Sequence, residues 1–425
     1  MKFHKKLFLI PIILFIIGAN YAWLNPHPEF KVYKTLDFPF FFQFNPDDGV
    51  QIISSAYFPE AFRMYKDRIS RPTYPFLVNS IGYFSRIILK PFKKISDVEA
   101  AGGGYIILKL ILFLLASITL FNVFDSFFHD QSLSFFGVFL ILFHPFSIEA
   151  FSTFHTFELQ FINPILFSFF FFNLSRKYNH TKNIFFSIIV GILLLGRQNY
   201  AIYLSFLTFS LFDKHYLRAI VSFISHLFPL VLYYFFLNLN NINYVSHEFE
   251  NYDQGIFILN YIKDFQFGQL FIELRTSLFF FIKSIFSYFY IVLLFIILGY
   301  KNLKVTKNHL IYLTAILFFT YLQFLAARKY DITYMVSDMS IFIVGVGLYA
   351  IKNNSFLILN KNKIASVYFL ISIFTLINLP LKNPYEFEFR SQEVLNQRKN
   401  MVEHPEKYSD IDRKNARNGI LIKKE

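Results

Sequence analysis

Long apolar runs separated by short polar clusters dominate this chain. Runs near twenty residues are long enough for a helix to cross a ~30 Å hydrocarbon core. We assign eleven such segments, at 7–23, 104–124, 133–150, 157–174, 184–196, 199–212, 219–238, 277–298, 309–326, 335–351 and 364–380. The pattern therefore predicts an all-α, polytopic integral membrane protein with about eleven transmembrane helices.

Two polar parts remain outside these segments. We expect residues 1–380 to form one membrane domain with a large first exoplasmic loop at 24–103, followed by a polar C-terminal tail at 381–425. Within the loop, residues 50–65 predict a short interfacial helix. Phe76–Leu89 is apolar on much of its circumference but only fourteen residues long, which favours a second amphipathic helix at the interface. Gly102–Gly104 then predicts a flexible joint.

The orientation of the spans follows from the basic clusters. The first run has no small-x-small cleavage site after it, so we interpret it as an uncleaved span with a cytoplasmic N-terminus. If Arg176, Lys177 and Lys182 are cytoplasmic, most of the later basic clusters are cytoplasmic as well, as the positive-inside rule favours. This choice requires residues 184–212 to be two short spans that turn near 196–199. One long helix there would reverse the orientation of every later span across the membrane. The cluster at 90–94 would instead favour a span at 76–89.

Composition supports a membrane protein and removes several function classes. Hydrophobic residues make up 55% of the chain and charged residues 16%, against about a quarter in soluble proteins. The net charge is +13, and the basic residues lie between the spans, as the positive-inside rule predicts. The positive charge therefore does not indicate nucleic-acid binding. Because the chain has no cysteine, disulfides, thiolate metal sites and cysteine nucleophiles are excluded.

The acidic pair Asp47 and Asp48 is the strongest chemical candidate. It stands in Asn45-Pro-Asp-Asp-Gly49, about twenty residues after the first span and ahead of Arg71-Pro-Thr-Tyr-Pro75. A carboxylate at the membrane surface can act as a general base, worth roughly 10²–10⁴ in rate. The alternative is a tight turn, since Asp and Gly favour turns. The motif alone does not decide between them.

The order of a span, Pro46-Asp47-Asp48, an amphipathic segment and Arg71-Pro-Thr-Tyr-Pro75 resembles the first exoplasmic loop of the GT-C class of membrane glycosyltransferases. Shorter likenesses follow at His144-Pro-Phe-Ser-Ile-Glu149, Thr156-Phe-Glu158, Leu193-Leu-Leu-Gly-Arg197 and Arg328-Lys-Tyr330. The resemblance covers most of residues 1–350 through short, degenerate motifs. It implies a mannosyltransferase-like enzyme that uses a polyprenyl- or dolichyl-phosphate sugar donor, in a cell membrane such as the bacterial inner membrane.

The resemblance also implies roles for individual residues. Asp47, ahead of Asp48, would take the proton of a glycan, lipid or protein acceptor during an inverting displacement. The leaving phosphate needs cations, and Arg328 is the first candidate because its planar guanidinium suits phosphate. The further expected substrate or phosphate ligands are Lys329, Tyr330, Arg71, Tyr74, Arg86, Lys90 and Arg197. For the Arg86 and Lys90 cluster, contact with anionic membrane lipids is the alternative.

Four more polar residues stay open to several interpretations. Arg197 ends a short apolar run, so it faces a cavity or a partner, or reaches the surface at a turn. Glu149, His155 and Glu158 are expected on the exoplasmic face, where they would bind a divalent metal, orient substrate or simply be solvated. No cofactor follows from the sequence with certainty.

Two other functions fit the same features. A non-catalytic transporter or flippase for lipid-linked saccharide would use the basic loop residues to bind phosphate. A saccharide polymerase would place its large loop later in the chain, and the moderate size of the 239–276 loop weighs against it.

Overall fold

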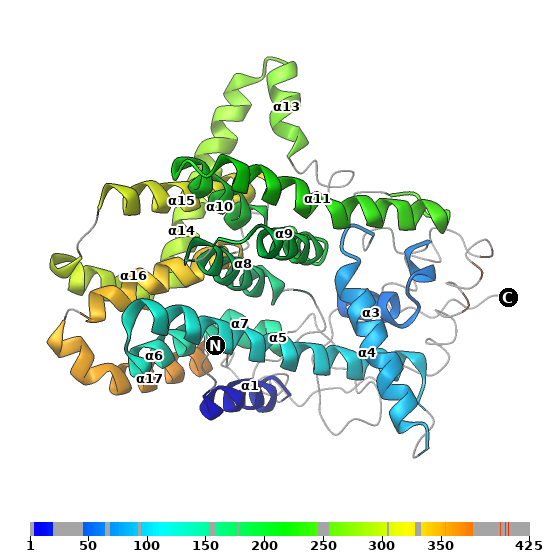
Figure 1. The fold of residues 1–425 in the computed structure, drawn as a ribbon, viewed down its shortest axis with the longest axis horizontal. Helices are drawn as coiled ribbons and strands as arrows, with labels where there is room; N and C mark the ends of the chain where they lie inside the picture. The colour runs from blue at the N-terminus through cyan, green and yellow to red at the C-terminus, as the bar shows by residue number, and fades with distance from the viewer. Residues whose placement is uncertain are drawn as a thin grey trace.

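The computed structural model describes residues 4–19, 46–63, 69–91, 95–152, 156, 158–176, 178–244, 255–303, 306–327, 333–352, 354–376, 400, 404 and 407. The elements among these residues are helices, with no strand (Figure 1). In order they are η1 (Lys5–Phe8), α1 (Leu9–Ala19), α3 (Pro46–Ala56), η2 (Glu60–Arg63), α4 (Thr73–Leu89), α5 (Asp97–Phe128), α6 (Gln131–Leu142), α7 (Pro145–Ser152), α8 (Leu159–Arg176), α9 (His180–Leu194), α10 (Tyr200–Phe212), α11 (Tyr216–Leu239), α13 (Ile256–Lys263), α14 (Phe267–Gly299), η4 (Tyr300–Asn302), α15 (Lys307–Ala327), η5 (Thr333–Met339), α16 (Ser340–Lys352) and α17 (Ser355–Leu376).

Each of the eleven predicted segments contains a helix, which confirms the all-α class. Six helices in the described part of the chain are long and apolar enough to cross a membrane, and they lie at 99–128, 216–239, 267–299, 309–327, 335–352 and 357–374. A seventh span results if α6 and α7, bent by 64° at their junction, cross together. Helices α8, α9 and α10 are apolar but shorter. A polytopic membrane protein is compatible with this fold, and the count of eleven stays a prediction.

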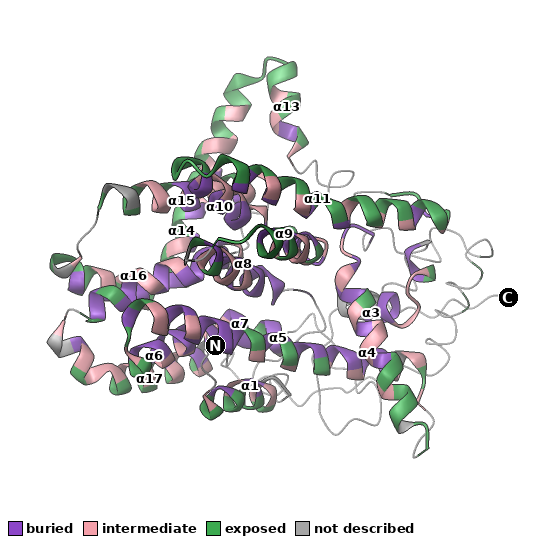
Figure 2. Cartoon of the chain, in the orientation of Figure 1, coloured by how far each residue is buried: buried purple, intermediate pink, exposed green. Residues whose placement is uncertain are grey.

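The outer surface of the bundle is apolar. Figure 2 shows exposed stretches along α11. The side chains of Ile224, Leu232 and Phe235 on α11 and of Phe279 and Phe286 on α14 are exposed. A soluble bundle would bury residues of this kind against another element. Their outward position is expected for a surface in contact with lipid.

Hydrogen bonds define two opposite ends of the bundle. At one end, which we call the Asp338 end, Asn199 at the start of α10 and Gln323 near the end of α15 both bind the Asp338 carboxylate. At the other end, the Lys352 end, Lys352 donates to the carbonyl of Phe128 at 2.8 Å, and Tyr312 donates to Asp213 at 2.7 Å. Helices α3 and α4 extend beyond the bundle on the right of Figure 1.

Glycines bring α4 and α5 into close contact. A Cβ atom added at Gly104 would lie 2.5 Å from the carbonyl oxygen of Val78, and one at Gly82 would lie 2.6 Å from that of Ala100. Residues 102–104 are therefore helical and tightly packed, and the prediction of a flexible joint there was wrong. Small residues at helix contacts let two backbones approach in this way.

Candidate functional site

The acidic pair stands at the start of helix α3. The helix begins at Pro46 and includes Asp47 and Asp48, so the interpretation of Pro-Asp-Asp-Gly as a tight turn was wrong. Proline is favoured at the first position of a helix because its missing N–H has no helical acceptor there. Acidic residues are favoured in the first turn by the helix dipole. The side chains of Asp47 and Asp48 lie outside the described part of the structure.

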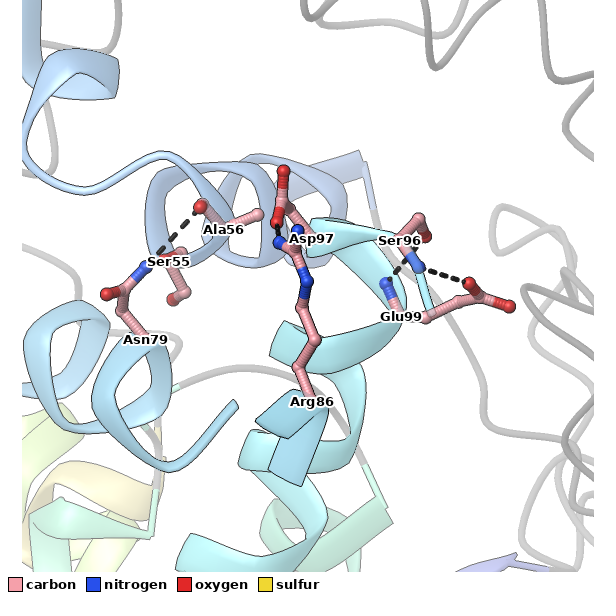
Figure 3. Close-up of polar contacts among 7 residues, drawn as sticks. All are labelled: Ser55, Ala56, Asn79, Arg86, Ser96, Asp97 and Glu99. Atoms are coloured by element: carbon pink, nitrogen blue, oxygen red, sulfur yellow. Dashed lines mark hydrogen bonds and ion pairs between the residues drawn. The ribbon is translucent and has the colours of Figure 1, made fainter. Parts of the chain in front are cut away.

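The second half of α3 is fixed against α4 and α5. Ser55 donates to the Tyr105 hydroxyl oxygen of α5 at 3.3 Å. Asn79 of α4 donates to the carbonyl of Ser55 at 2.8 Å and to that of Ala56 at 3.3 Å, which satisfies the open end of the helix (Figure 3). Asp48 is seven residues before Ser55, or about 10 Å along the axis. The acidic residues thus stand in the first turn of a helix whose C-terminal end, which we call the base of α3, is held in place by hydrogen bonds.

A buried charge cluster lies next to this base. Tyr74 donates to Oε1 of Glu158, and Nζ of Lys109 lies 3.7 Å from Oε2 of the same carboxylate. Lys109 also donates to the carbonyl of Ala150 at 2.6 Å. The rings of Tyr74 and Tyr105 are 5.3 Å apart, so this cluster adjoins the residue that holds Ser55.

Glu158 has no exposed surface, so of its three interpretations the one in which it is simply solvated was wrong. Lys109 supplies the opposite charge that a buried carboxylate requires. Burial raises the pKa of the Tyr74 hydroxyl well above its ordinary value, and the nearby charge of Glu158 raises it further. Tyr74 therefore stays protonated and remains a hydrogen-bond donor to the carboxylate.

A second polar cluster surrounds Asp338. Its Oδ1 accepts from Gln160 Nε2 at 2.6 Å and from Asn199 Nδ2 at 2.9 Å, and its Oδ2 accepts from Gln323 Nε2 at 2.8 Å. Arg197 donates from Nε to Gln160 Oε1 at 2.9 Å. Four segments far apart in sequence meet here, and the carboxylate is fully buried.

Arg197 therefore has a buried partner and does not extend to the surface from its turn. Of its two interpretations, the structure favours the one in which a charge in an apolar region faces a polar group. Helices α9 and α10 are separate, with the break at 195–199, as the predicted topology requires.

The two clusters meet at the start of α8. Glu158 and Gln160 are two residues apart, and side chains at that spacing point in different directions. Glu158 binds Tyr74 and Lys109, whereas Gln160 binds Arg197 and Asp338. Together they form one continuous polar layer at the Asp338 end, beside the base of α3.

Arg86 and Lys90 do not join this layer. Arg86 forms an exposed ion pair with Asp97, at the start of the capped helix α5 (Figure 3). Ser96 and Glu99 form the reciprocal capping box that begins this helix. Lys90 follows the end of α4 and is exposed. It lies sixteen residues after Tyr74, or about 24 Å along the helix.

Of the remaining predicted site residues, two lie in the described part of the structure and four lie outside it. Arg71 is half-buried directly ahead of α4, and Glu149 is an exposed residue of α7. The phosphate ligands expected at Arg328, Lys329 and Tyr330, and His155, lie outside the described residues. Within the described part, no group of three His, Asp or Glu side chains could hold a metal ion.

Sequence reasoning missed Lys109 and Asp338 as members of the site. The available signal was the same for both: each is a lone charge within a predicted span, which usually marks a residue with a buried partner. The amide partners Gln160, Asn199 and Gln323 gave no such signal, because uncharged polar residues occur singly in many spans.

Comparison with known proteins identifies no relative: no protein-family model, curated protein or solved structure matches the chain.

Proposed function

We propose that this chain is a GT-C-like membrane glycosyltransferase that transfers a sugar from a polyprenyl-phosphate donor to a glycan, lipid or protein acceptor. The observation that supports the proposal most is the position of Asp47 and Asp48 in the first turn of α3, whose other end is held by Asn79 and Tyr105. A general base works only when its position relative to the substrate is fixed. The contacts between the C-terminal end of α3 and the buried polar layer would hold the acidic turn in a fixed position.

In this reaction the Asp47 carboxylate accepts the proton of the acceptor hydroxyl. The acceptor oxygen forms a bond to the anomeric carbon while the bond from that carbon to the phosphate oxygen breaks. The polyprenyl phosphate leaves with the electron pair, and the anomeric configuration inverts. Arg328, with Lys329 and Arg71, is the proposed source of positive charge for the leaving phosphate.

The same proposal includes the finer topology. Eleven spans would place the 24–103 loop on the exoplasmic face of a cell membrane, in a bacterium the inner membrane, with residues 381–425 as a polar tail. The hydrogen bonds at the Asp338 end support one part of this arrangement. They bring together the ends of segments that the topology assigns to the same face.

Amide substitutions at the acidic pair test the catalytic role. Membranes containing Asp47→Asn, Asp48→Asn or Asp264→Asn would be assayed for transfer from a polyprenyl-phosphate sugar. We expect Asp47→Asn to lower the rate about 10²–10⁴-fold at normal expression, because an amide cannot accept the proton. Asp264, an exposed residue between α13 and α14, is the matched control and should keep full activity. Full transfer in both variants of the acidic pair would reject its role as the general base.

A further inference from the structure

Arg218 is a buried charge that forms no ion pair with a described carboxylate, although the Asp213 carboxylate acts on it at longer range. It lies in the first turn of α11 and is only 7% exposed. Among the described residues no carboxylate lies within ion-pair distance of its guanidinium. The nearest acidic residue in sequence, Asp213, accepts a hydrogen bond from Tyr312 instead. A buried ion normally needs a partner, since the interior does not replace its lost hydration.

The hydrogen bonding of Arg218 is equally incomplete. Among the described residues its five N–H groups make one hydrogen bond, from Nη2 to the carbonyl of Phe171 at 3.4 Å. The guanidinium carbon lies 4.8 Å from the ring centroid of Phe171 and 6.0 Å from that of Tyr178. Stacking on aromatic rings orients the group but does not neutralise it.

Arg218 lines a pocket at the Lys352 end of the bundle. The pocket is a small cavity of about 40 Å³, partly open to the outside, and its lining residues come from α8, α9, α10 and the start of α11. Its walls are mainly aromatic, and its polar lining residues besides Arg218 include Asn183, Ser187, Ser210 and Ser222. The aromatic wall residues are Phe167, Phe170, Phe171, Phe186, Tyr203 and Phe206. The pocket therefore joins a cationic end to an apolar interior.

The surroundings of the pocket also favour an anion. Two helices, α9 and α11, begin at this end of the bundle and two, α8 and α10, end there, so the partial charges of the helix termini offset one another and the side chains decide the local charge. The first turn of α11 has no side-chain cap. Lys182 and Lys214 are exposed in the same two helix starts and supply further positive charge. Arg218, Lys182 and Lys214 thus stand against Asp213, the acidic residue that acts on Arg218.

We propose that this pocket binds the phosphate monoester head of an amphiphilic lipid, with Arg218 as the phosphate ligand and the aromatic walls as the seat of the first part of its apolar chain. Arginine is suited to the head group because its planar fork can donate two parallel hydrogen bonds to phosphate oxygens. From Leu174 to Phe167 the walls extend seven residues along α8, or about 10 Å. The site is distinct from the polar layer at the other end of α8 and does not depend on the proposed glycosyl transfer.

Binding of farnesyl phosphate to the full chain in detergent micelles tests the proposal. We expect saturable binding that weakens at least tenfold in Arg218→Gln and is unchanged in Arg275→Gln, which removes an exposed arginine of α14. Farnesol should bind much more weakly than farnesyl phosphate, and inorganic phosphate should compete poorly. Equal binding of farnesol would overturn the role of the phosphate. Equal binding of inorganic phosphate would overturn the amphiphile.

Two further measurements separate binding from a structural role. Without ligand, Arg218→Gln should unfold at the same or a higher temperature than the parent chain, because it removes an uncompensated buried charge. A lower unfolding temperature would indicate that Arg218 is structural and overturn the proposal. Ser187→Phe fills the pocket from α9, so binding at parental affinity in that variant would also overturn it. Because the proposed donor site would also bind a polyprenyl phosphate, the comparison is repeated in the Arg328→Gln background. Arg218→Gln should still weaken binding there at least tenfold, and an unchanged affinity would overturn the pocket.

Discussion

At the scale of single residues, the polar layer shows how charges persist in an apolar bundle. Glu158 and Lys109 are both buried, and each loses its hydration on folding. Their mutual attraction, together with the hydrogen bond that Tyr74 donates to Glu158, offsets this cost only while both members are present. Asp338 is stabilised differently, since three amide N–H groups are directed at its two oxygens. The burial of Glu158 therefore depends on the charge of Lys109, whereas the burial of Asp338 depends on hydrogen bonds from amide groups.

This dependence predicts a specific pattern of stability. Lys109→Met leaves the Glu158 charge uncompensated and should lower the free energy of unfolding by about 3–5 kcal/mol. The double variant Lys109→Met/Glu158→Gln should recover most of that loss, because both charges are gone. Arg86→Met breaks the exposed pair with Asp97 and should change stability by no more than about 1 kcal/mol. Unfolding in mixed detergent micelles measures all three, and a double variant as unstable as Lys109→Met would contradict the argument.

At the scale of elements, the apolar pattern predicted where helices occur but not how they end or pack. The predicted span at 104–124 is part of a helix that begins at Asp97, because Ser96 and Glu99 cap it. That capping signal was present in the sequence. The close contact at Gly104 was not predictable, since it depends on the opposing backbone of Val78, which only the folded pair of helices brings near. Likewise, Asp338 could be recognised as an intramembrane acid, while its three partners come from distant segments.

The glycine contact between α4 and α5 supports a second prediction. Gly104→Ala places a methyl group against the Val78 carbonyl, so the helices must separate, at a cost of about 1–3 kcal/mol. Gly268→Ala is the matched control, because an added Cβ there meets no atom within 4 Å. That change should be neutral or stabilising by up to about 1 kcal/mol, since alanine favours helix. Thermal unfolding of the two variants checks this, and equal stability of Gly104→Ala and the parent chain would contradict the tight packing.

At the scale of the whole molecule, the bundle has two chemically different ends. The Asp338 end carries the buried polar layer and the base of α3, whereas the Lys352 end carries the pocket of Arg218. Helix α8 connects them, and its eighteen residues span about 27 Å. That length approaches the thickness of a hydrocarbon core. If the predicted topology is right, the two ends face opposite sides of the membrane.

The chain is suited to a direct test of this arrangement, because it contains no cysteine and gives no background labelling. Gln198 and Lys214 are exposed residues that flank α10 at opposite ends. With single cysteines at these positions, an impermeant maleimide applied to intact cells should label Gln198→Cys and leave Lys214→Cys unlabelled until the membrane is opened. Lys301→Cys, also exposed, should behave as Lys214→Cys does. Because α10 has only thirteen residues, about 20 Å, labelling of both flanks from one side would mean that α9 and α10 do not each cross. The eleven-span topology would then be wrong, while the two-ended bundle and its polar layer would remain.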